Sequence, residues 1–413
     1  MKERPNLLIA GASGGVANAL LHHLSAVRDL FGKLVLLDRN RKILYDVYLD
    51  HERLKYEFLE VELKFPDHME KYHKILREHD IDIVLDITDM DSIPFLEATN
   101  AAGVSYVNTG MNDDHELIQE SVIKAYEKKD SYDKAPHILC TGMNPGVVNM
   151  WVRYGIEKFG VPKELVHFEY DTSKFVREWH PMMTWSVHEF LVECVRDTTG
   201  VLLGRGRDKV KELKPNGLEH RKNMKSILGP IMKFGSYPDG MITMHEECVS
   251  IAQKYDIPSQ FIYAVHPKTM ELLVKVYERK GNVTKDMLEL GNNTSEILDG
   301  ADNIGVFLEY PDKRVYYFNT IPSVAIIGTN ATFTQVVVGV FSALNVLITD
   351  ELKPGAYFPE DLFDTCYRHF MFDNMRVQEF VFKKGENGHL KLSSFNPMLK
   401  SRRTDHYRHL YII

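Results

Sequence analysis

Short runs of apolar, β-branched residues alternate with helical patterns along the first 145 residues. The apolar runs cover residues 6–10, 33–37, 58–63, 82–87, 104–108 and 137–140. Residues 67–79 carry apolar side chains at helical spacing behind Asp67, a residue type that caps helix starts. Strands that alternate with helices are typical of a parallel sheet with right-handed crossover connections. We therefore predict a doubly wound, Rossmann-type α/β domain over residues 1–145.

The pattern changes after the Asn144-Pro145-Gly146 turn. Residues 147–159 predict one long helix that leaves the sheet. The following residues mix strand-like runs (166–170, 305–310, 315–319) with helical segments (245–255, 268–279). This mixture predicts an α+β substrate and dimerisation domain over residues 146–330.

Three further segments complete this expected organisation. Residues 205–225 are rich in Arg, Lys, Gly and Pro and predict a surface loop. Residues 332–348 are strongly apolar but are interrupted by polar residues and are shorter than a membrane span, so we predict a buried helix. It lies in a helical segment, 331–370, that returns to the first domain. Residues 371–413 are expected to form an exposed tail.

Composition narrows the class of protein. The chain has 413 residues with 50 Lys plus Arg against 58 Asp plus Glu, a net charge of −8 that offers no basic footprint for nucleic acid. Hydrophobic residues at 44% and charged residues at 26% are typical of a folded, water-soluble protein without a membrane segment. The four cysteines are widely spaced and form no C-x-x-C pair, so we expect reduced thiols and a cytoplasmic protein.

A glycine-rich turn stands between the first strand and an apolar helical pattern. It reads Gly11-Ala12-Ser13-Gly14-Gly15-Val16-Ala17. Strand, glycine turn and helix are the context in which backbone N–H groups and a helix N-terminus bind a pyrophosphate. The spacing is G-x-x-G-x-x-A rather than G-x-G-x-x-G, so a tight turn without a ligand stays open as an alternative.

Asp38 directly follows the second apolar run, where an acidic residue binds the ribose hydroxyls in dinucleotide-binding proteins. A carboxylate there favours NAD over NADP because it repels a 2′-phosphate, although the neighbouring Arg39 weakens that preference. The alternative is that Asp38 caps the following helix. Together these patterns predict an NAD site, and the complete set of expected cofactor-binding residues is Gly11, Ser13, Gly14, Gly15, Val16, Asp38, Asp89, Thr109, Asn144 and Pro145.

Several longer motifs resemble the saccharopine dehydrogenase-like superfamily, and within it the bacterial homospermidine synthases. The first is a G-x-[ND]-P-G junction, Gly142 to Gly146. The others are Thr184-Trp185-Ser186-Val187 with Glu193, His245-Glu246-Glu247, Glu296 to Val306, and Asn330-Ala331-Thr332 ahead of Gln335-Val336. The resemblance covers most of the chain, from Leu7 to about Leu362.

The resemblance implies an enzyme that uses NAD to oxidise putrescine to an imine, exchanges amines with a second putrescine, and reduces the new imine to a polyamine. It also implies a homodimer that contacts through extended strands of the second domain. The residues that would serve catalysis by this resemblance are Trp185 near the cationic intermediate, Glu193 and Glu247 at ammonium groups, Asn144 near the nicotinamide, and Asp302 in the substrate pocket.

The chemistry explains why such residue types are needed, and it leaves alternatives open. Removing hydride from a carbon that bears nitrogen creates positive charge, which carboxylates and an aromatic face stabilise. Glu193, Glu247 and His245 are candidate bases. Trp185 is also compatible with a core position, and Glu247 with a favourable place at a helix start. His245 is not in an H-E-x-x-H motif, so no metal is expected.

Two other functions stay open. One is a carboxynorspermidine or saccharopine dehydrogenase that acts on a carboxylated imine, because the His-Glu-Glu segment also resembles carboxynorspermidine dehydrogenases and arginines are available to bind a carboxylate, namely Arg177, Arg205, Arg207 and Arg221. The other is a non-catalytic NAD-binding protein. An acidic cleft without arginine would indicate an amine substrate.

Overall fold

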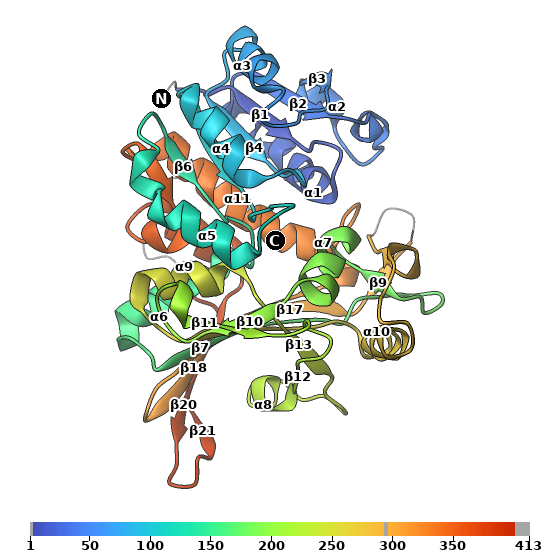
Figure 1. The fold of residues 1–413 in the computed structure, drawn as a ribbon, viewed down its shortest axis with the longest axis vertical. Coiled ribbons are helices and arrows are strands. Elements are labelled where there is room, and N and C mark those ends of the chain that lie inside the picture. Colours follow the sequence, from blue (N-terminus) through green and yellow to red (C-terminus); the bar gives the residue numbers. More distant parts are fainter. Residues whose placement is uncertain (1–2, 293–295, 401–413) are drawn as a thin grey trace. The chain divides into compact units, whose positions relative to one another are not determined.

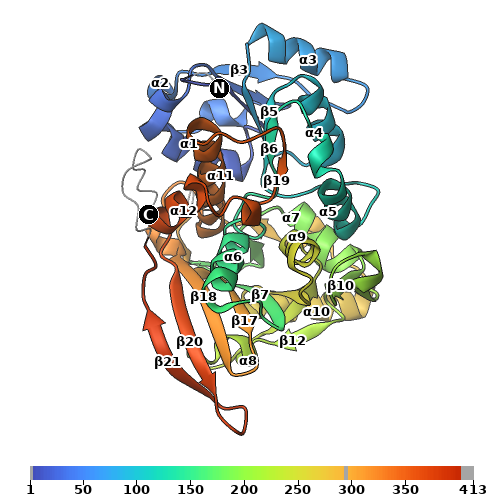
Figure 2. The same cartoon turned by 90° about the vertical axis from the view of Figure 1, so that its left-hand side faces the viewer.

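A computed structural model describes residues 3–292 and 296–400, which form two compact units (Figures 1 and 2). Unit 1 contains residues 3–150, 334–375 and Lys400, and unit 2 contains residues 151–292, 296–333 and 376–399. The chain passes between the units within helices α6 (Val147–Phe159) and α11 (Ala331–Thr349), and again after α12 (Cys366–Asn374).

Seven parallel strands form the sheet of unit 1 in the order β19-β6-β5-β4-β1-β2-β3. Their bounds are β1 (Leu7–Ala10), β2 (Leu34–Asp38), β3 (Glu57–Glu60), β4 (Ile83–Asp86), β5 (Ser105–Asn108), β6 (Pro136–Ile138) and β19 (Gly355–Tyr357). The run from β3 to β6 is the doubly wound order of a Rossmann-type sheet. The predicted α/β fold is therefore confirmed, and all six predicted strands are present. The seventh, β19, is supplied by the returning segment.

Helices and short 3₁₀ turns connect these strands. The helices are α1 (Gly15–Leu24), α2 (His51–Leu54), α3 (Met69–Glu78), α4 (Ser92–Ala101), α5 (Ile118–Glu127) and α12, and the 3₁₀ turns are Ser25–Leu30, Lys42–Tyr45, Lys129–Ser131 and Pro359–Asp361. Helix α3 begins two residues after Asp67, which therefore does not cap it. Helix α11 is long and apolar enough to cross a membrane, but 89% of its apolar window is buried inside the structure, as predicted for a core helix.

The larger sheet of unit 2 is mixed and has ten strands in the path β11-β10-β14-β7-β17-β18-β20-β21, with β13 and β12 attached to β14. Their bounds are β7 (Glu164–Asp171), β10 (Thr199–Leu202), β11 (Val210–Leu213), β12 (Arg221–Asn223), β13 (Asp239–Thr243), β14 (Ser259–Ala264), β17 (Ala301–Glu309), β18 (Lys313–Pro322), β20 (Gln378–Lys384) and β21 (Leu390–Asn396). Two small pairs accompany it: β8 (Lys174–Phe175) with β16 (Leu298–Asp299), and β9 (Met182–Met183) with β15 (Glu289–Leu290).

The helical segments of unit 2 are short apart from two. They are α7 (Val187–Leu191), continued by a π-helical turn at Val192–Arg196, then α8 (Lys225–Leu228), α9 (Glu246–Tyr255) and α10 (Pro267–Lys280), with 3₁₀ turns at Arg207–Lys209, Lys285–Met287 and Ser323–Ala325. Helices α9 and α10 confirm the two helical segments predicted at 245–255 and 268–279. The mixed content confirms the predicted α+β second part.

The two faces of the unit 2 sheet differ in chemistry. Side chains alternate between faces along a strand, and in β7 the residues Val166, Phe168 and Tyr170 enter an apolar cluster with aromatic residues of β17 and β18. His167, Glu169 and Asp171 point to the opposite face and are also buried. This second face, called the polar face below, therefore holds buried ionisable groups.

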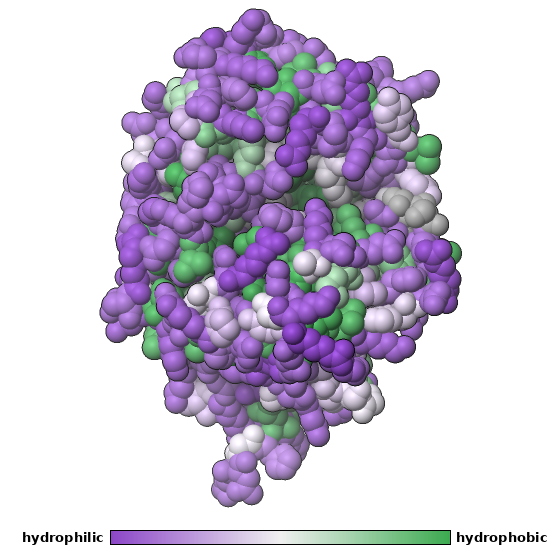
Figure 3. Space-filling model, turned by 45° about the vertical axis from the view of Figure 1, so that its right-hand side comes forward, coloured by the Kyte–Doolittle hydropathy of each residue, from purple (hydrophilic) through white to green (hydrophobic). Residues whose placement is uncertain are grey.

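Two expectations differ from the structure. Residues 205–225 are not one loop, because they contain β11 and β12. Residues 371–413 are not simply a tail, because β20 and β21 lie within them and join the unit 2 sheet; Figure 2 shows this red hairpin extending beyond the neighbouring strands. Strands β11, β12 and β21 lie at sheet edges and are largely exposed, which gives a sequence pattern close to that of a loop. The face drawn in Figure 3 is mainly hydrophilic, with hydrophobic residues in small groups.

Candidate functional site

The glycine turn of unit 1 brings the backbone after β1 close to the segment after β4. Gly11 follows β1 with φ of +83°, and a Cβ atom there would lie 2.4 Å from the carbonyl oxygen of Ile87. Gly14 precedes α1 and Gly15 begins it, and no acidic residue stands in the first turn of the helix. The N–H groups in the first turn of α1 can therefore meet an anion without an acidic side chain of the same turn beside them.

Asp38 ties this turn to the segment after β2. Its carboxylate accepts hydrogen bonds from the Ser13 N–H at 2.8 Å and from the Asn40 N–H at 2.9 Å. The next helical turn begins at Lys42, behind Arg41, so the alternative role of Asp38 as its cap is wrong. Asp89 is exposed, with Oδ2 3.5 Å from Nη2 of Arg39. The structure thus places Asp38, but not Asp89, against the glycine turn.

Thr109 and Pro145 flank the Gly142–Gly146 turn at the carboxyl ends of β5 and β6. A Cβ atom on Gly142 would lie 3.1 Å from the carbonyl oxygens of both residues. Asn144, within this turn, is half-buried. The turn is held in place because the Gly146 N–H donates to Oδ1 of Asn149 at 2.9 Å. The structure therefore groups the predicted residues Thr109, Asn144 and Pro145 at the sheet edge where ligands bind in such folds.

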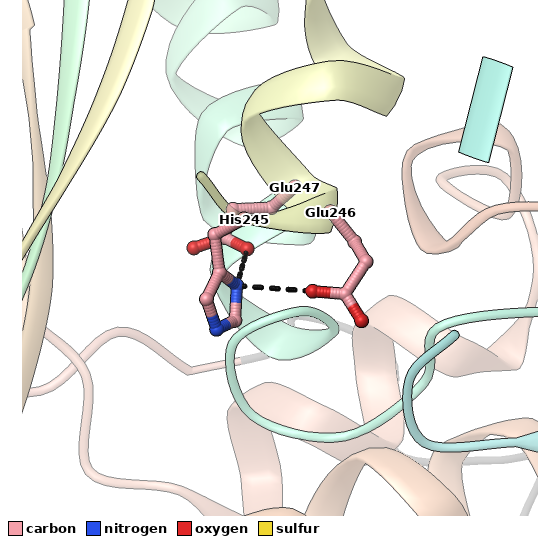
Figure 4. A group of neighbouring side chains, drawn as sticks. All are labelled: His245, Glu246 and Glu247. Atoms are coloured by element: carbon pink, nitrogen blue, oxygen red, sulfur yellow. Dashed lines mark hydrogen bonds and ion pairs between the residues drawn. The ribbon is translucent and has the colours of Figure 1, made fainter. Parts of the chain in front are cut away.

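A second group of predicted residues surrounds His245 in unit 2. Figure 4 shows the His245 ring beside Glu246 and Glu247 at the start of α9. Nδ1 of His245 is hydrogen-bonded to Oε2 of Glu247 and lies 3.3 Å from Oε2 of Glu246. Nε2 lies 3.9 Å from Oε2 of Glu193, on the π-helical turn. Glu247 therefore does lie in the first turn of α9, the alternative that the sequence left open for it, and it contacts His245 from there.

The carboxylates around His245 control its protonation. Burial alone lowers the pKa of His245, but the charges of Glu247, Glu246 and Glu193 outweigh it and raise this pKa to about 10. Burial raises the pKa of Glu193 to about 8, against the opposing effect of His245. Burial also acts to raise the pKa of Glu247, but the His245 charge and hydrogen bond keep it below its usual range. At neutral pH the group is therefore an imidazolium between an ionised Glu247 and a protonated Glu193.

His245, Glu246 and Glu247 also offer three ligand atoms within 4.8 Å of one another, a grouping that could hold a metal ion. A histidine nitrogen must be unprotonated to bind a metal. The hydrogen bond between Nδ1 of His245 and Oε2 of Glu247 uses the same side chains, so an ion pair is a second account of this grouping.

Asp302 belongs to a buried hydrogen-bonded network on the same polar face. Its Oδ2 accepts from the Thr332 hydroxyl at 2.7 Å, and that hydroxyl lies 2.8 Å from the Thr184 hydroxyl. Thr184 donates to Oδ2 of Asp171 at 2.6 Å. Burial, followed by the nearby Glu169 and Asp171, raises the pKa of Asp302 well above its usual range. Asp302 is thus a buried residue of β17.

Trp185 lies beside this network and is half-buried. Its Nε1–H donates to the Tyr263 hydroxyl at 2.9 Å, and burial raises the pKa of Tyr263 well above its usual range, with Glu169 and Asp171 adding to the effect. Among the described residues, no lysine or arginine forms a hydrogen bond or ion pair with any of the four acids Asp171, Glu193, Glu247 and Asp302. The polar face therefore concentrates carboxylates and aromatic rings.

Sequence reasoning missed Glu169, Asp171, His167 and Tyr263. A signal for three of them was present, because polar and aromatic residues alternate strictly along His167-Phe168-Glu169-Tyr170-Asp171. That alternation predicts a strand with one polar face. It does not reveal that the polar face is buried, since burial depends on the distant segments that cover it.

Part of unit 1 matches the sequence model of a known protein family. Residues 7–135 match the family model described as "Saccharopine dehydrogenase NADP binding domain". Residues 7–135 are therefore similar to the nucleotide-binding domain of saccharopine dehydrogenases, and the resemblance drawn from the sequence motifs is confirmed over this segment.

Two known proteins that are similar to this chain are both homospermidine synthases. The chain is 25% identical over 259 residues to a homospermidine synthase of Mesorhizobium japonicum, and the matched part covers 50% of this chain and 52% of that protein. The chain therefore spans about half the length of this relative. Its fold is similar to the crystal structure of the homospermidine synthase of Legionella pneumophila in complex with NAD, with a TM-score of 0.71, 16% identity, and coverage of 90% of this chain and 89% of the other.

Proposed function

We propose that this chain is an NAD-dependent enzyme of polyamine formation, which oxidises a diamine such as putrescine and reduces an amine-exchanged imine. The observation that carries the proposal is the buried polar face of unit 2, where carboxylates and aromatic rings gather. In the part of the chain that the structure describes, the acids Asp171, Glu193, Glu247 and Asp302 have no lysine or arginine partner. A cationic amine suits such a site, whereas a carboxylated substrate needs arginine or lysine.

The residues of unit 1 fit a dinucleotide. A side chain at position 11 would clash with the carbonyl oxygen of Ile87, so glycine here permits the tight turn that opens a dinucleotide-binding fingerprint. Asp38 ends β2, where its carboxylate can also accept hydrogen bonds from a ribose. The bound NAD would supply the chemistry of accepting and returning hydride. We infer NAD rather than NADP from the charge of Asp38, although the matching family model is named for NADP.

The chain's own residues would handle charge and protons. Glu247 stays ionised, and a bound cation favours the ionised form of Asp171 and Asp302, whose pKa values burial raises. Such carboxylates stabilise ammonium groups and the positive charge that develops when an amine becomes an iminium. The half-buried Trp185 offers an aromatic face worth about 0.5–2 kcal/mol to a cation. Glu193 keeps 24% of its side chain exposed, so it can exchange protons with solvent. We assign Glu193 the role of base and His245 the role of acid.

A direct assay tests the function. The purified chain is incubated with NAD and putrescine, and the products are identified by mass spectrometry while NADH is followed by absorbance. Homospermidine and ammonia without accumulation of NADH are expected, because oxidation and reduction balance in each cycle. No product with putrescine or with related diamines would disprove the proposal.

The second candidate is a dehydrogenase that acts on a carboxylated imine, favoured by Glu246 beside Glu247. It predicts one nicotinamide consumed for each product formed. The arginine arrangement argues against it: Nε of Arg177 lies 2.6 Å from Glu296, and Arg205 is bonded to the carbonyl oxygen of Lys254 at 2.8 Å. Both guanidinium groups therefore have partners away from the His245 group.

The rate of the reaction should depend on pH in a defined way. Glu193 must be ionised to act as a base, so activity is expected to rise as pH increases through about 8, the pKa to which burial raises this group. His245 must stay protonated to act as an acid, so activity is expected to fall above about pH 10. A pH profile of kcat/KM measures both limbs. Glu193→Gln should remove the rise near pH 8, and an unchanged rise would refute the assignment of the base.

We also propose that two copies of the chain associate through the β20–β21 hairpin. Strand β21 is the edge of its sheet, and Leu392 and Phe395 are 50% and 49% exposed on it. An exposed apolar edge strand is a favourable site for pairing with a second copy. Light scattering should give about twice 47.7 kDa for the native chain and 47.7 kDa for Phe395→Lys. The control Leu290→Lys alters a comparably exposed residue on β15 and should leave the dimer intact.

A further inference from the structure

His167 is a buried histidine on β7 whose ring lacks a hydrogen-bond partner within residues 3–292 and 296–400. Its side chain is 1% exposed, and neither Nδ1 nor Nε2 is bonded. Its cross-strand neighbours, Phe261 of β14 and Val306 of β17, are buried hydrophobic residues. A buried N–H without a partner costs free energy and is rare in folded proteins, so this ring needs one.

Glu247 presents the complementary atom. Its Oε2 is bonded to His245, whereas its Oε1 has no hydrogen-bond partner among the described residues and lies 4.0 Å from Nδ1 of His167. That separation is too long for a direct hydrogen bond. It is within the span that one water molecule bridges, and buried waters characteristically bind polar groups that are otherwise unsatisfied.

We propose that His167 is a positioning residue for the His245–Glu247 pair, acting through one ordered water molecule. The Nδ1–H of His167 donates to the water, and the water donates to Oε1 of Glu247. Both oxygens of Glu247 then have donors, so the carboxylate stays ionised and keeps Oε2 directed at Nδ1 of His245. The acid role of His245 rests on the proposed function, but the position and protonation of the pair do not.

The charges around the pair agree with this direction of the hydrogen bonds. Burial lowers the pKa of His167 to about 4, so its ring is neutral and carries one N–H. The titratable groups that influence His245 are Glu246 and Glu247 of α9 and Glu193 of the π-helical turn, and His245 and Glu247 in turn influence His167 of β7. Loss of the donor from His167 would destabilise the Glu247 carboxylate and therefore the imidazolium of His245.

The test is a nitrogen-15 NMR titration of the full chain labelled at histidine, without substrate. In the native protein His167 should be the neutral tautomer with its proton on Nδ1. In His167→Phe the pKa of His245 should fall by about one pH unit, a tenfold loss of proton affinity. His167→Asn should restore it because the asparagine amide occupies the place of Nδ1, and His167→Gln should not because its amide occupies the place of Nε2.

Packing effects are separated by Val306→Ala, which disturbs the same part of the sheet without removing a donor. This variant should leave the pKa of His245 unchanged. An equal shift in Val306→Ala and His167→Phe, or a native His167 protonated on Nε2, would overturn the proposal. Should His167→Phe not fold, the tautomer of native His167 and the contrast between the asparagine and glutamine variants still decide. Failure of the putrescine assay would overturn only the proposed function, because this titration uses no substrate.

Discussion

Replacing Glu247 with glutamine is expected to lower kcat/KM for the amine by about 100- to 1,000-fold. The reason is that removing one partner of a buried ion pair leaves the other charge uncompensated. A loss of this size corresponds to about 2.7–4 kcal/mol of transition-state stabilisation. His245 would then release its proton at a lower pH, because Glu247 provides both the largest favourable charge and a hydrogen bond at Nδ1. The site would lose its acid and one anionic group together.

Steady-state rates with a diamine and saturating NAD measure this effect, and the pH profile separates it from a general loss of structure. The falling limb near pH 10 should move to lower pH in Glu247→Gln. Asp299→Asn is a suitable control because it removes a carboxylate that is 57% exposed and paired with Lys174, away from the polar face. A Glu247→Gln enzyme with native rates and a native pH profile would disprove the role of the His245 group.

The parts of the fold that were predicted correctly depend on residues that are close together in the sequence. The first strands of unit 1 are buried on both faces, so each appears as a continuous apolar run, and the glycine turn follows β1 with a positive φ at Gly11. Likewise, α6 begins directly after the Gly142–Gly146 turn and ends at Phe159, as its helical pattern predicted. These features depend on neighbouring residues, so they can be inferred without knowing the tertiary structure.

The parts that were missed depend on contacts distant in sequence. Asp302 meets Asp171 only through the register of β17 with β7, and the Thr332 hydroxyl reaches Asp302 from the start of α11. His167 and Glu247 approach each other across 80 residues of chain, which no local pattern encodes. Strand β19 has three residues and depends on pairing with β6. Some members of the site, such as Asp302 and Glu247, could therefore be predicted one by one, but their partners on β7 and the network that joins them could not.

Replacing Gly11 with alanine is expected to destabilise the nucleotide-binding unit by about 3–5 kcal/mol and to weaken NAD binding at least tenfold, by about 1.4 kcal/mol or more. Two effects combine at this position. Alanine is disfavoured at the φ of +83° found here, and its Cβ atom would approach the carbonyl oxygen of Ile87 to 2.4 Å. Because that oxygen belongs to the backbone, relief requires movement of the turn, which would also displace the N–H groups at the start of α1.

Gly103→Ala separates these two effects. Gly103 also has a positive φ, +70°, but a Cβ atom there would meet no other atom within 4 Å. This variant should therefore cost only about 1 kcal/mol through backbone strain and should leave NAD binding unchanged. Urea denaturation measures the first quantity and isothermal titration calorimetry with NAD the second. If the two alanine variants were equally destabilised and bound NAD equally well, the steric contact at Ile87 would not define the turn, and the dinucleotide would have to bind elsewhere on the sheet.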